Sequence, residues 1–249
     1  MGLVAGPRVP ATNDPRGVWH LPLDQAGQKA LAARRAVAEV QDGMVLGLGT
    51  GSTAALVVSA LGVRVAREGL RVVGVATSEA TLAQARALGI PVATLEERPV
   101  LDLDIDGADE VDPRRDLVKG LGGALLREKI VALAARRLVI VVDESKLVSR
   151  LGEHALVPVE VVPFGWRRTA GELAALGAEP HLRAGADGPV HTDGGHYILD
   201  CRFPPGEELA PLASAIKGLT GVVEHGLFCG LQPTVVVGAA DGSCRVWTG

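Results

Sequence analysis

Short apolar segments alternate with helical patterns through roughly the first 150 residues of the chain. This alternation limits the number of possible folds more than any other feature of the sequence. Strands are predicted at residues 44–48, 72–76, 92–95, 101–106 and 138–142. Helices are predicted at residues 25–40, 79–88 and 124–135, with a further helix capped by Ser52. Strands that alternate with helices form βαβ units, so we expect a parallel sheet covered by helices on both faces. Ligands bind such sheets beyond the carboxyl ends of the strands.

The pattern changes after Leu151. Strands at residues 157–162, near 181, at 197–201 and at 222–228, with helices at 170–176 and 212–219, follow the order βαββαβ. That order is typical of a ferredoxin-like unit. Two final strands, at residues 234–237 and 244–247, are expected to return to the first sheet.

The predicted fold class is therefore α/β, with a Rossmann-like parallel-sheet domain and a second, smaller ferredoxin-like α+β domain. The first domain is predicted to comprise residues 24–151 plus 229–249, and the second residues 152–228. Residues 1–23 contain four prolines and no periodic pattern, so they are predicted to form a flexible tail.

The composition argues against several classes of partner. A net charge of −4 and the absence of a basic stripe argue against nucleic acid, which is bound by clustered Lys and Arg. No apolar run approaches the roughly 18 residues of a membrane span. Three cysteines without a CxxC pair fit a reducing compartment, so we expect a cytoplasmic protein with no membrane partner.

A glycine-rich turn, Gly47-Leu-Gly-Thr-Gly-Ser-Thr53, joins the first predicted strand to a helix. Unpaired N–H groups and the helix dipole attract anions at such a junction, so a phosphate group is the expected ligand. The turn lacks the third glycine of the dinucleotide fingerprint and the lysine of a nucleotide P-loop. A tight turn without any ligand is the alternative interpretation.

Acidic residues alternate along the fourth predicted strand. Asp102, Asp104 and Asp106 share one face of it, and Asp109 lies just beyond its end. We expect Asp102 and Asp104 to be on an ordinary solvated face. Asp106 and Asp109 are at the predicted ligand edge, where two carboxylates could bind hydroxyls, hold a metal or divide acid and base roles.

Lysine is scarce in this chain, with five residues against twenty Arg, so each retained lysine is informative. Lys119 lies among glycines that let backbone approach a ligand closely. Helical periodicity alone places the nearby Glu128 on an exposed polar face, whereas the glycines favour a site. A general base at Glu128 would have an ammonium close by to stabilise an enediolate. The spacing of the six His does not indicate a metal site, and we predict no metal.

Together these segments resemble the A-type ribose-5-phosphate isomerase family from about Gln25 onward. The resemblance rests on six motifs in order: Gly49-Thr-Gly-Ser-Thr53, Asp106-Gly-Ala-Asp-Glu110, Lys119-Gly-Leu-Gly-Gly-Ala-Leu-Leu-Arg-Glu-Lys129, Asp143-Glu-Ser-Lys146, Pro158-Val-Glu-Val161 and Gly226-Leu-Phe228. It implies isomerisation of ribose 5-phosphate to ribulose 5-phosphate through a cis-enediol, in the non-oxidative pentose phosphate pathway, without metal or cofactor. It also implies a homodimer or larger homo-oligomer.

The resemblance further implies roles for individual residues. Glu128 would move the proton between C2 and C1, and Asp106 would assist ring opening. Asp109 and Lys119 would hold the hydroxyls and the developing oxyanion. The implied substrate-binding residues are Lys29, Thr50, Gly51, Ser52, Thr53, Asp106, Gly107, Ala108, Asp109, Lys119, Gly120, Gly122 and Lys146, of which Lys29, Ser52, Thr53 and Lys146 would hold the phosphate.

The chain departs from the family pattern at three places. Leu121 replaces a usual glycine, Asp104 replaces an uncharged residue, and Gly195-His196 replaces Gly-Asn. Two other functions remain as alternatives at this stage. A sugar-phosphate sensor could share the sheet and the phosphate turn, and a coenzyme A transferase of similar fold would use Glu128 to form an acyl-enzyme.

Overall fold

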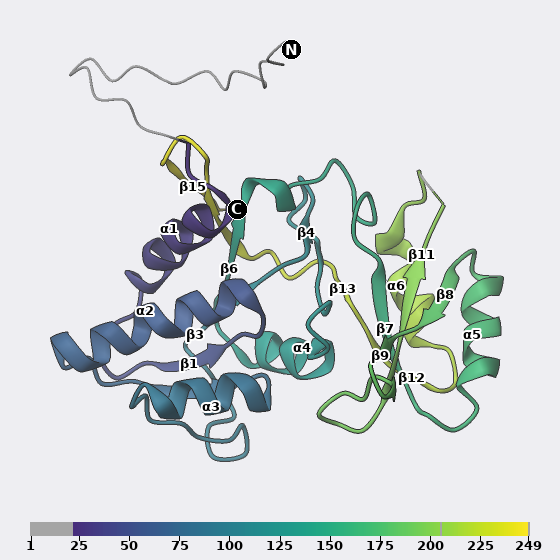
Figure 1. Cartoon of the computed structure of the whole chain (residues 1–249), viewed down its shortest axis with the longest axis horizontal. Helices are drawn as coiled ribbons and strands as arrows, with labels where there is room; N and C mark the ends of the chain where they lie inside the picture. The colour runs from purple at the N-terminus through teal and green to yellow at the C-terminus, as the bar shows by residue number, and fades with distance from the viewer. Residues whose placement is uncertain (1–21, 205, 249) are drawn as a thin grey trace, which may run out of the picture.

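The computed structural model describes residues 22–204 and 206–248 (Figure 1), and its larger sheet has six strands. The strand order is β15-β14-β6-β3-β1-β2, and only β15 is antiparallel to its neighbour. The strands are β1 (Val45–Leu48), β2 (Val73–Ala76), β3 (Leu103–Gly107), β6 (Leu138–Asp143), β14 (Thr234–Gly238) and β15 (Cys244–Trp247). This arrangement confirms the α/β fold class and the return of the last two strands to the first sheet.

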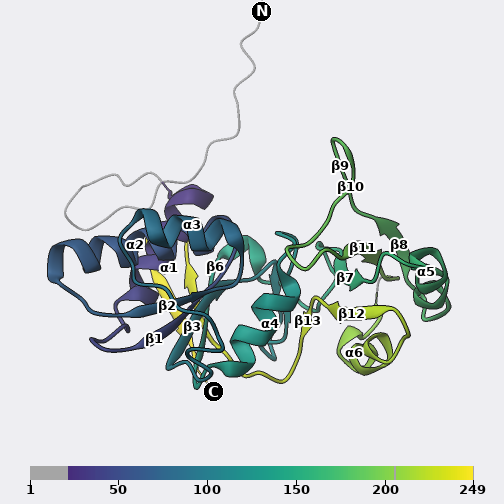
Figure 2. The ribbon, with the colours of Figure 1, turned by 90° about the horizontal axis from the view of Figure 1, so that it is seen from below.

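Helices cover both faces of this sheet (Figure 2). They are α1 (Gln25–Val37), α2 (Ser52–Glu68), α3 (Glu79–Ala87) and α4 (Leu125–Ala134). The largest apolar cluster joins α1 and α2 to one face of the sheet, whereas α4 packs on the opposite face, where Val131 contacts Val75 and Leu101. Asp24 caps α1 by accepting a hydrogen bond from the N–H of Gly27 at 2.8 Å.

Two local predictions for this region are wrong. Residues 92–95 form no strand, because Val92 makes only an isolated bridge to Gly74 and the chain then turns. Glu97 stabilises that turn by accepting a hydrogen bond from the N–H of Thr94 at 2.8 Å. Ser52 is the first residue of α2 and not its cap, since Gly51 holds the cap position with φ of 105°.

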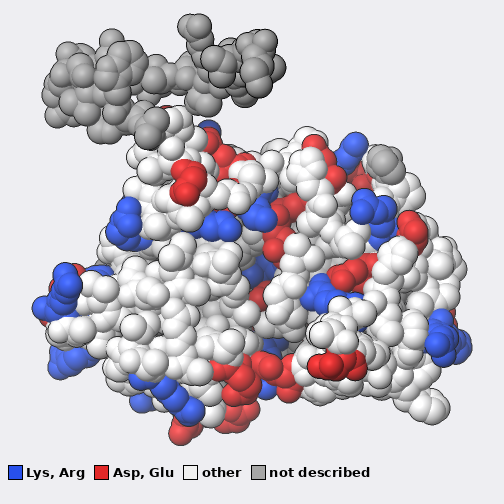
Figure 3. Space-filling model, viewed as in Figure 1, with Lys and Arg blue, Asp and Glu red and all other residues white. Residues whose placement is uncertain are grey.

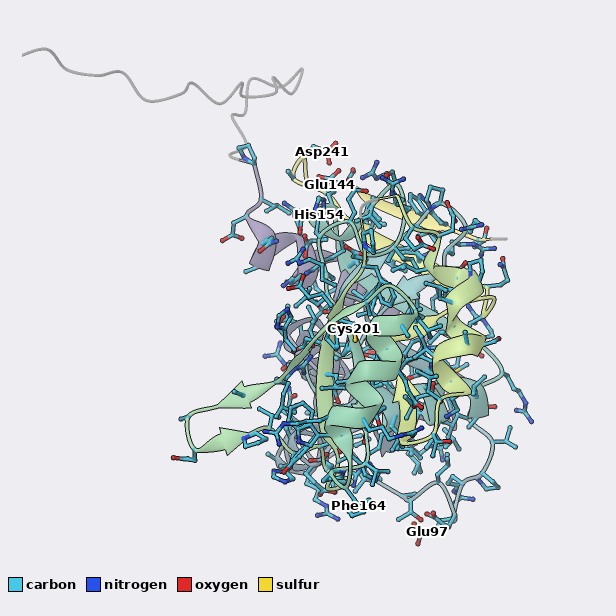
Figure 4. All side chains as sticks on the ribbon, turned by 90° about the vertical axis from the view of Figure 1, so that its right-hand side faces the viewer. Glu97, Glu144, His154, Phe164, Cys201 and Asp241 are labelled. Carbon is cyan, nitrogen blue, oxygen red and sulfur yellow. The ribbon has the colours of Figure 1, made fainter. Side chains whose placement is uncertain are left out.

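The second sheet has the predicted βαββαβ order. It contains β7 (Val157–Val161), α5 (Trp166–Ala175), β8 (Glu179–Leu182), β11 (Tyr197–Arg202), α6 (Leu209–Lys217) and β12 (Val222–His225). The strand order is β12-β7-β11-β8, with every pair antiparallel, as in a ferredoxin-like unit. Cys201 lies in its apolar core (Figure 4). The sequence pattern did not predict the projecting hairpin of β9 (Ala184–Gly185) and β10 (Gly188–Pro189).

A third, small antiparallel sheet links the two larger ones. It pairs β4 (Glu110–Val111) with β5 (Leu117–Val118), and β5 with β13 (Leu227–Phe228). The carboxylate of Glu110 also accepts hydrogen bonds of 2.6 Å from three backbone N–H groups at residues 152–155. The boundaries proposed for the two domains remain a prediction, and most of the proposed tail, residues 1–21, lies outside the described residues.

Asp104 is buried in the six-stranded sheet, which corrects the expectation of a solvated face. Its side chain is 0% exposed, and neither carboxylate oxygen has a hydrogen-bond partner among the described residues. Asp102 keeps partial exposure and pairs with Arg136 at 2.6 Å. Burial raises the pKa of Asp104, and the neighbouring charge of Asp106 raises it further.

Replacement of Asp104 by Asn is expected to increase stability more at pH 8 than at pH 4. The pKa of Asp104 is higher in the folded chain than in the unfolded chain. Its contribution to stability is therefore intact below the unfolded value and is lost as pH rises through the folded value, by up to about 1.4 kcal/mol per pH unit. Asn does not titrate. The free energy of unfolding, measured by urea titration at several pH values, checks this.

The matched control is Asp102→Asn, which removes a carboxylate from the partly exposed residue just before β3. A difference for Asp104→Asn that stays constant from pH 4 to pH 8 would contradict the buried, proton-binding state of this side chain.

Candidate active site

A pocket of about 90 Å³ opens at the carboxyl edge of the six-stranded sheet. Every residue that the sequence predicts for the site lines this pocket, except Asp106. Figure 3 shows acidic and basic side chains gathered in the depression between the two halves of the molecule. The sheet topology therefore brings together segments that are more than 100 residues apart in the sequence.

A larger cavity of about 630 Å³ lies beside α3 and α4. Its lining includes apolar residues such as Leu82 and Ile130 and charges of both signs, as at Arg86 and Glu97. It contains none of the predicted site residues. Size alone does not identify a catalytic site, and the smaller pocket is the one that contains convergent charged groups.

The glycine-rich turn forms one wall of the pocket because its glycines allow a close approach. A Cβ atom on Gly49 would lie 2.0 Å from Oδ1 of Asp106, so no larger residue fits there. Gly51 has a φ of 105°, which favours glycine. The N–H of Thr50 donates to Oδ1 of Asp106 at 3.1 Å, and α2 begins two residues later with its N-terminal end at the pocket.

Two lysines stand beside this helix end. The ammonium of Lys29, on α1, donates to the hydroxyl of Ser52 at 3.3 Å and lies 3.9 Å from Asp143. Lys146 closes a short 3-10 helix, Glu144–Lys146, and lines the same pocket, as does Thr53. Two cations next to a helix N-terminus form an environment that suits a phosphate dianion.

Lys119 is the central cation of the site. Its ammonium lies 2.9 Å from Oδ2 of Asp106 and 3.3 Å from Oε2 of Glu128, and it donates to the carbonyl of Gly107 at 2.5 Å. The residue is only 3% exposed. Burial opposes the charged form, but the two carboxylates outweigh it and raise the pKa of Lys119 above its usual range.

Glu128 lies in the first turn of α4 and is 2% exposed, so the exposed position indicated by helical periodicity is wrong. Periodicity missed this because the polar side of α4 faces Lys119 and the sheet edge at this point. Burial raises the pKa of Glu128 to about 8, against the opposing effect of Lys119. Such a value near neutral pH is typical of a tuned general base.

Asp106 is 0% exposed and does not line the pocket, in contrast to its predicted contact with substrate. Its oxygens bind Lys119 and the N–H groups of Thr50 and Gly107, the last at 2.7 Å. Burial raises the pKa of Asp106 while Lys119 lowers it. The Asp106 carboxylate therefore holds the Lys119 ammonium and the glycine-rich turn in place without lining the pocket itself.

The loop between β5 and α4 completes the pocket. Asp109 lines it and accepts a hydrogen bond from the N–H of Leu121 at 3.0 Å. Gly120 and Gly123 have φ values of 99° and 85°, whereas Leu121 does not need a positive φ and turns its side chain partly to solvent. Leu121, a departure from the family pattern, therefore fits this loop without strain. Gly120, Gly122 and Ala108 also line the pocket.

Two neighbours of the site were assigned no role from the sequence, although Phe228 belongs to one of the family motifs. The ring of Phe228 lies beneath Lys119, with its centroid 5.6 Å from the ammonium. Arg183, from the second sheet, donates to the carbonyl of Leu121 at 3.0 Å. Both are distant in sequence from the residues that they contact.

The described part of the chain contains no group of three or more His, Cys, Asp or Glu side chains arranged to hold a metal ion. Within residues 22–204 and 206–248, no helix is both long and apolar enough to cross a bilayer.

Comparisons with known proteins agree with this geometry. The family described as Ribose 5-phosphate isomerase A (phosphoriboisomerase A) matches residues 73–242. Ribose-5-phosphate isomerase A of Gloeobacter violaceus is 59% identical over 221 residues, which cover 88% of this chain and 95% of that protein.

Solved structures are similar over nearly the whole chain. A D-ribose-5-phosphate isomerase in complex with phospho-erythronic acid has a TM-score of 0.88 and 37% identity, and the match covers 91% of this chain and 100% of that one. Ribose 5-phosphate isomerase A from Methanocaldococcus jannaschii has a TM-score of 0.84 and 42% identity, with 89% and 98% covered. This chain therefore belongs to the ribose 5-phosphate isomerase A family.

Proposed function

We propose that the protein interconverts D-ribose 5-phosphate and D-ribulose 5-phosphate through an enediol intermediate. The observation that carries this proposal is the buried cluster of Glu128, Lys119 and Asp106, which adjoins a pocket with a phosphate-binding environment. The sensor and coenzyme A transferase alternatives are not favoured by the family relationship.

The phosphate is held by Lys29, Lys146 and the start of α2, at Ser52 and Thr53. This placement uses the two ammonium groups and the free N–H groups of the helix end. Binding the phosphate there fixes the distance from the phosphate to the reacting carbons, and this positioning lowers the entropic cost of the reaction. Thr50, Gly51, Gly107, Ala108, Gly120 and Gly122 surround the sugar.

Glu128 is the base. Its carboxylate takes the proton from C2 of the open-chain aldose, and the electron pair of the broken C–H bond forms the enediolate double bond. Lys119 and Asp109 bind the substrate oxygens, and the ammonium stabilises the oxyanion that develops on O1. Glu128 then returns the proton to C1, while the proton of O2 passes to O1, which leaves the C2 carbonyl and the C1 hydroxyl of the ketose. Asp106 assists opening of the ring by way of Lys119.

The solved relative that binds phospho-erythronic acid supports this assignment. That ligand combines a phosphate with a planar carboxylate at the other end of a short polyol. A planar anionic group and a phosphate are also what the Lys119 region and the Lys29–Lys146 region would recognise in an enediolate phosphate.

Several broader features belong to the same proposal. We expect two domains, residues 24–151 plus 229–249 and residues 152–228, assembled into a homodimer or larger homo-oligomer. We also expect the enzyme to act in the non-oxidative branch of the pentose phosphate pathway in the cytoplasm. The three cysteines among the described residues are free, which fits a reducing compartment, and burial raises the pKa of the Cys201 thiol to about 12.

Replacing Glu128 by Gln should lower turnover of ribose 5-phosphate by about 10²- to 10⁴-fold, because the amide cannot accept the C2 proton. Ketose formation by the purified protein in excess EDTA measures this, and the wild-type rate should not depend on the chelator. A Glu128→Gln variant with turnover near that of the wild type would show that another group is the base.

The pH dependence of kcat/KM should report the ionisation of Glu128. The base acts only when ionised, and its pKa is about 8, so kcat/KM should fall roughly tenfold per pH unit as pH decreases below that value. Rates from about pH 6.5 upward avoid the second ionisation of the substrate phosphate near pH 6. A profile that stays flat down to pH 6.5 would contradict the raised pKa.

Replacing Lys29 or Lys146 by Ala should raise KM for ribose 5-phosphate by about tenfold each, through the loss of one charge at the phosphate. Inhibition by inorganic phosphate should weaken in parallel. Lys217→Ala is the control, since Lys217 pairs with Glu224 outside the pocket. If KM rises equally in all three variants, this phosphate site is misassigned.

A further inference from the structure

The loop that joins β5 to α4, residues 119–124, lies where the two larger sheets meet. It presents Lys119 to the pocket, and its remaining residues have few side-chain atoms because three of them are glycine. The N–H of Lys119 donates to the carbonyl of Gly226 at 2.9 Å, which fixes the first residue of the loop. The rest of the loop needs its own contacts to hold one conformation, since glycine-rich backbone is intrinsically mobile.

Arg183 supplies such contacts from the second sheet. It follows β8 directly, and its Nη1 donates to the carbonyl of Leu121 at 3.0 Å and lies 3.4 Å from the carbonyl oxygen of Gly120. These contacts connect residues that are 62 and 63 positions apart in the sequence. The guanidinium group of Arg183 therefore connects the second sheet to the catalytic loop by hydrogen bonds.

Asp200 fixes the orientation of this guanidinium. Its Oδ2 accepts from Nε of Arg183 at 2.8 Å, and its Oδ1 accepts from Nη2 at 2.5 Å. Both side chains are mostly buried, at 15% and 16% exposure. Because the guanidinium is planar, a bidentate contact on one edge leaves Nη1 directed at the loop, which a lysine ammonium could not reproduce.

The peptide groups of Leu121 are thereby held on two sides. Its N–H donates to Asp109, which lines the pocket, and its carbonyl accepts from Arg183. A shift of this residue would move the hydrogen-bond donor of Asp109 and the backbone that follows Lys119. Asp109 and Lys119 are the two residues assigned to the substrate oxygens under the proposed function.

We propose that Arg183, oriented by Asp200, is a positioning residue of the isomerase, which holds the 119–124 loop so that Lys119 and Asp109 meet the substrate oxygens. This inference rests on the proposed function for its effect on rate. The phosphate region at Lys29 and Lys146 is formed by other segments and does not depend on Arg183.

The test is Arg183→Lys, which keeps one positive charge but loses the planar fork. We expect kcat to fall roughly tenfold to hundredfold with KM nearly unchanged, because displacement of catalytic groups costs rate while phosphate binding persists. Exchange of the Leu121 amide hydrogen should be faster by about tenfold or more. Asp200→Asn should change both quantities in the same direction, and the double variant should lose less than the product of the two single effects.

The matched control is Arg168→Lys on α5, the helix between β7 and β8. The exposed side chain of Arg168 forms an ion pair with Glu172 there. It should leave kcat, KM and the Leu121 exchange rate unchanged. Thermal melting of every variant shows whether the protein is folded at the assay temperature.

A purely structural role would give a different result. Arg183→Lys would then lower the melting temperature without changing kcat or the exchange rate of the loop, and this outcome overturns the proposal. If the wild-type protein showed no isomerase activity, the proposed function would fail, while the exchange comparison would still decide whether Arg183 holds the loop.

Discussion

The interaction on which the rest of the site depends is the contact of one buried ammonium, that of Lys119, with the carboxylates of Asp106 and Glu128. Buried carboxylates without a counter-ion would carry a large desolvation cost. The surrounding backbone is shaped to permit this contact. Gly49 leaves room for Asp106, and Gly226 leaves room for the carbonyl of Lys119, which would lie 2.2 Å from a Cβ atom there. These two glycines are therefore required by the close packing around the buried ion pairs.

Much of the fold follows from sequence periodicity. The strands of the parallel sheet, the helices beside them and the βαββαβ order of the second unit each depend on local patterns that are long enough to recognise. The failures occur where local pattern carries no information. Two-residue strands such as β4, β5 and β13 are too short for any alternation. Residues 92–95 have the composition of a strand but form only one isolated β-bridge, between Val92 and Gly74.

Burial of charge was the least predictable property of the site. Asp104 and Glu128 both occupy positions that are polar by periodicity, yet both are buried in the folded chain. The family motifs identified the pocket residues well, because all of them except Asp106 line one cavity. Arg183 could not be found in this way, since its contact with the loop depends on how two sheets pack.

The second sheet is an insertion within the first, since the chain leaves after β6 and returns as β14 (Figure 1). The outgoing connection is fastened by the carboxylate of Glu110, and the returning one is fastened by the pairing of β13 with β5. A unit anchored at both ends has few rigid-body freedoms. Two anchors leave it less free to swing than a flap on a single hinge would be. Both anchors belong to the small sheet of β4, β5 and β13, whose middle strand leads directly into Lys119.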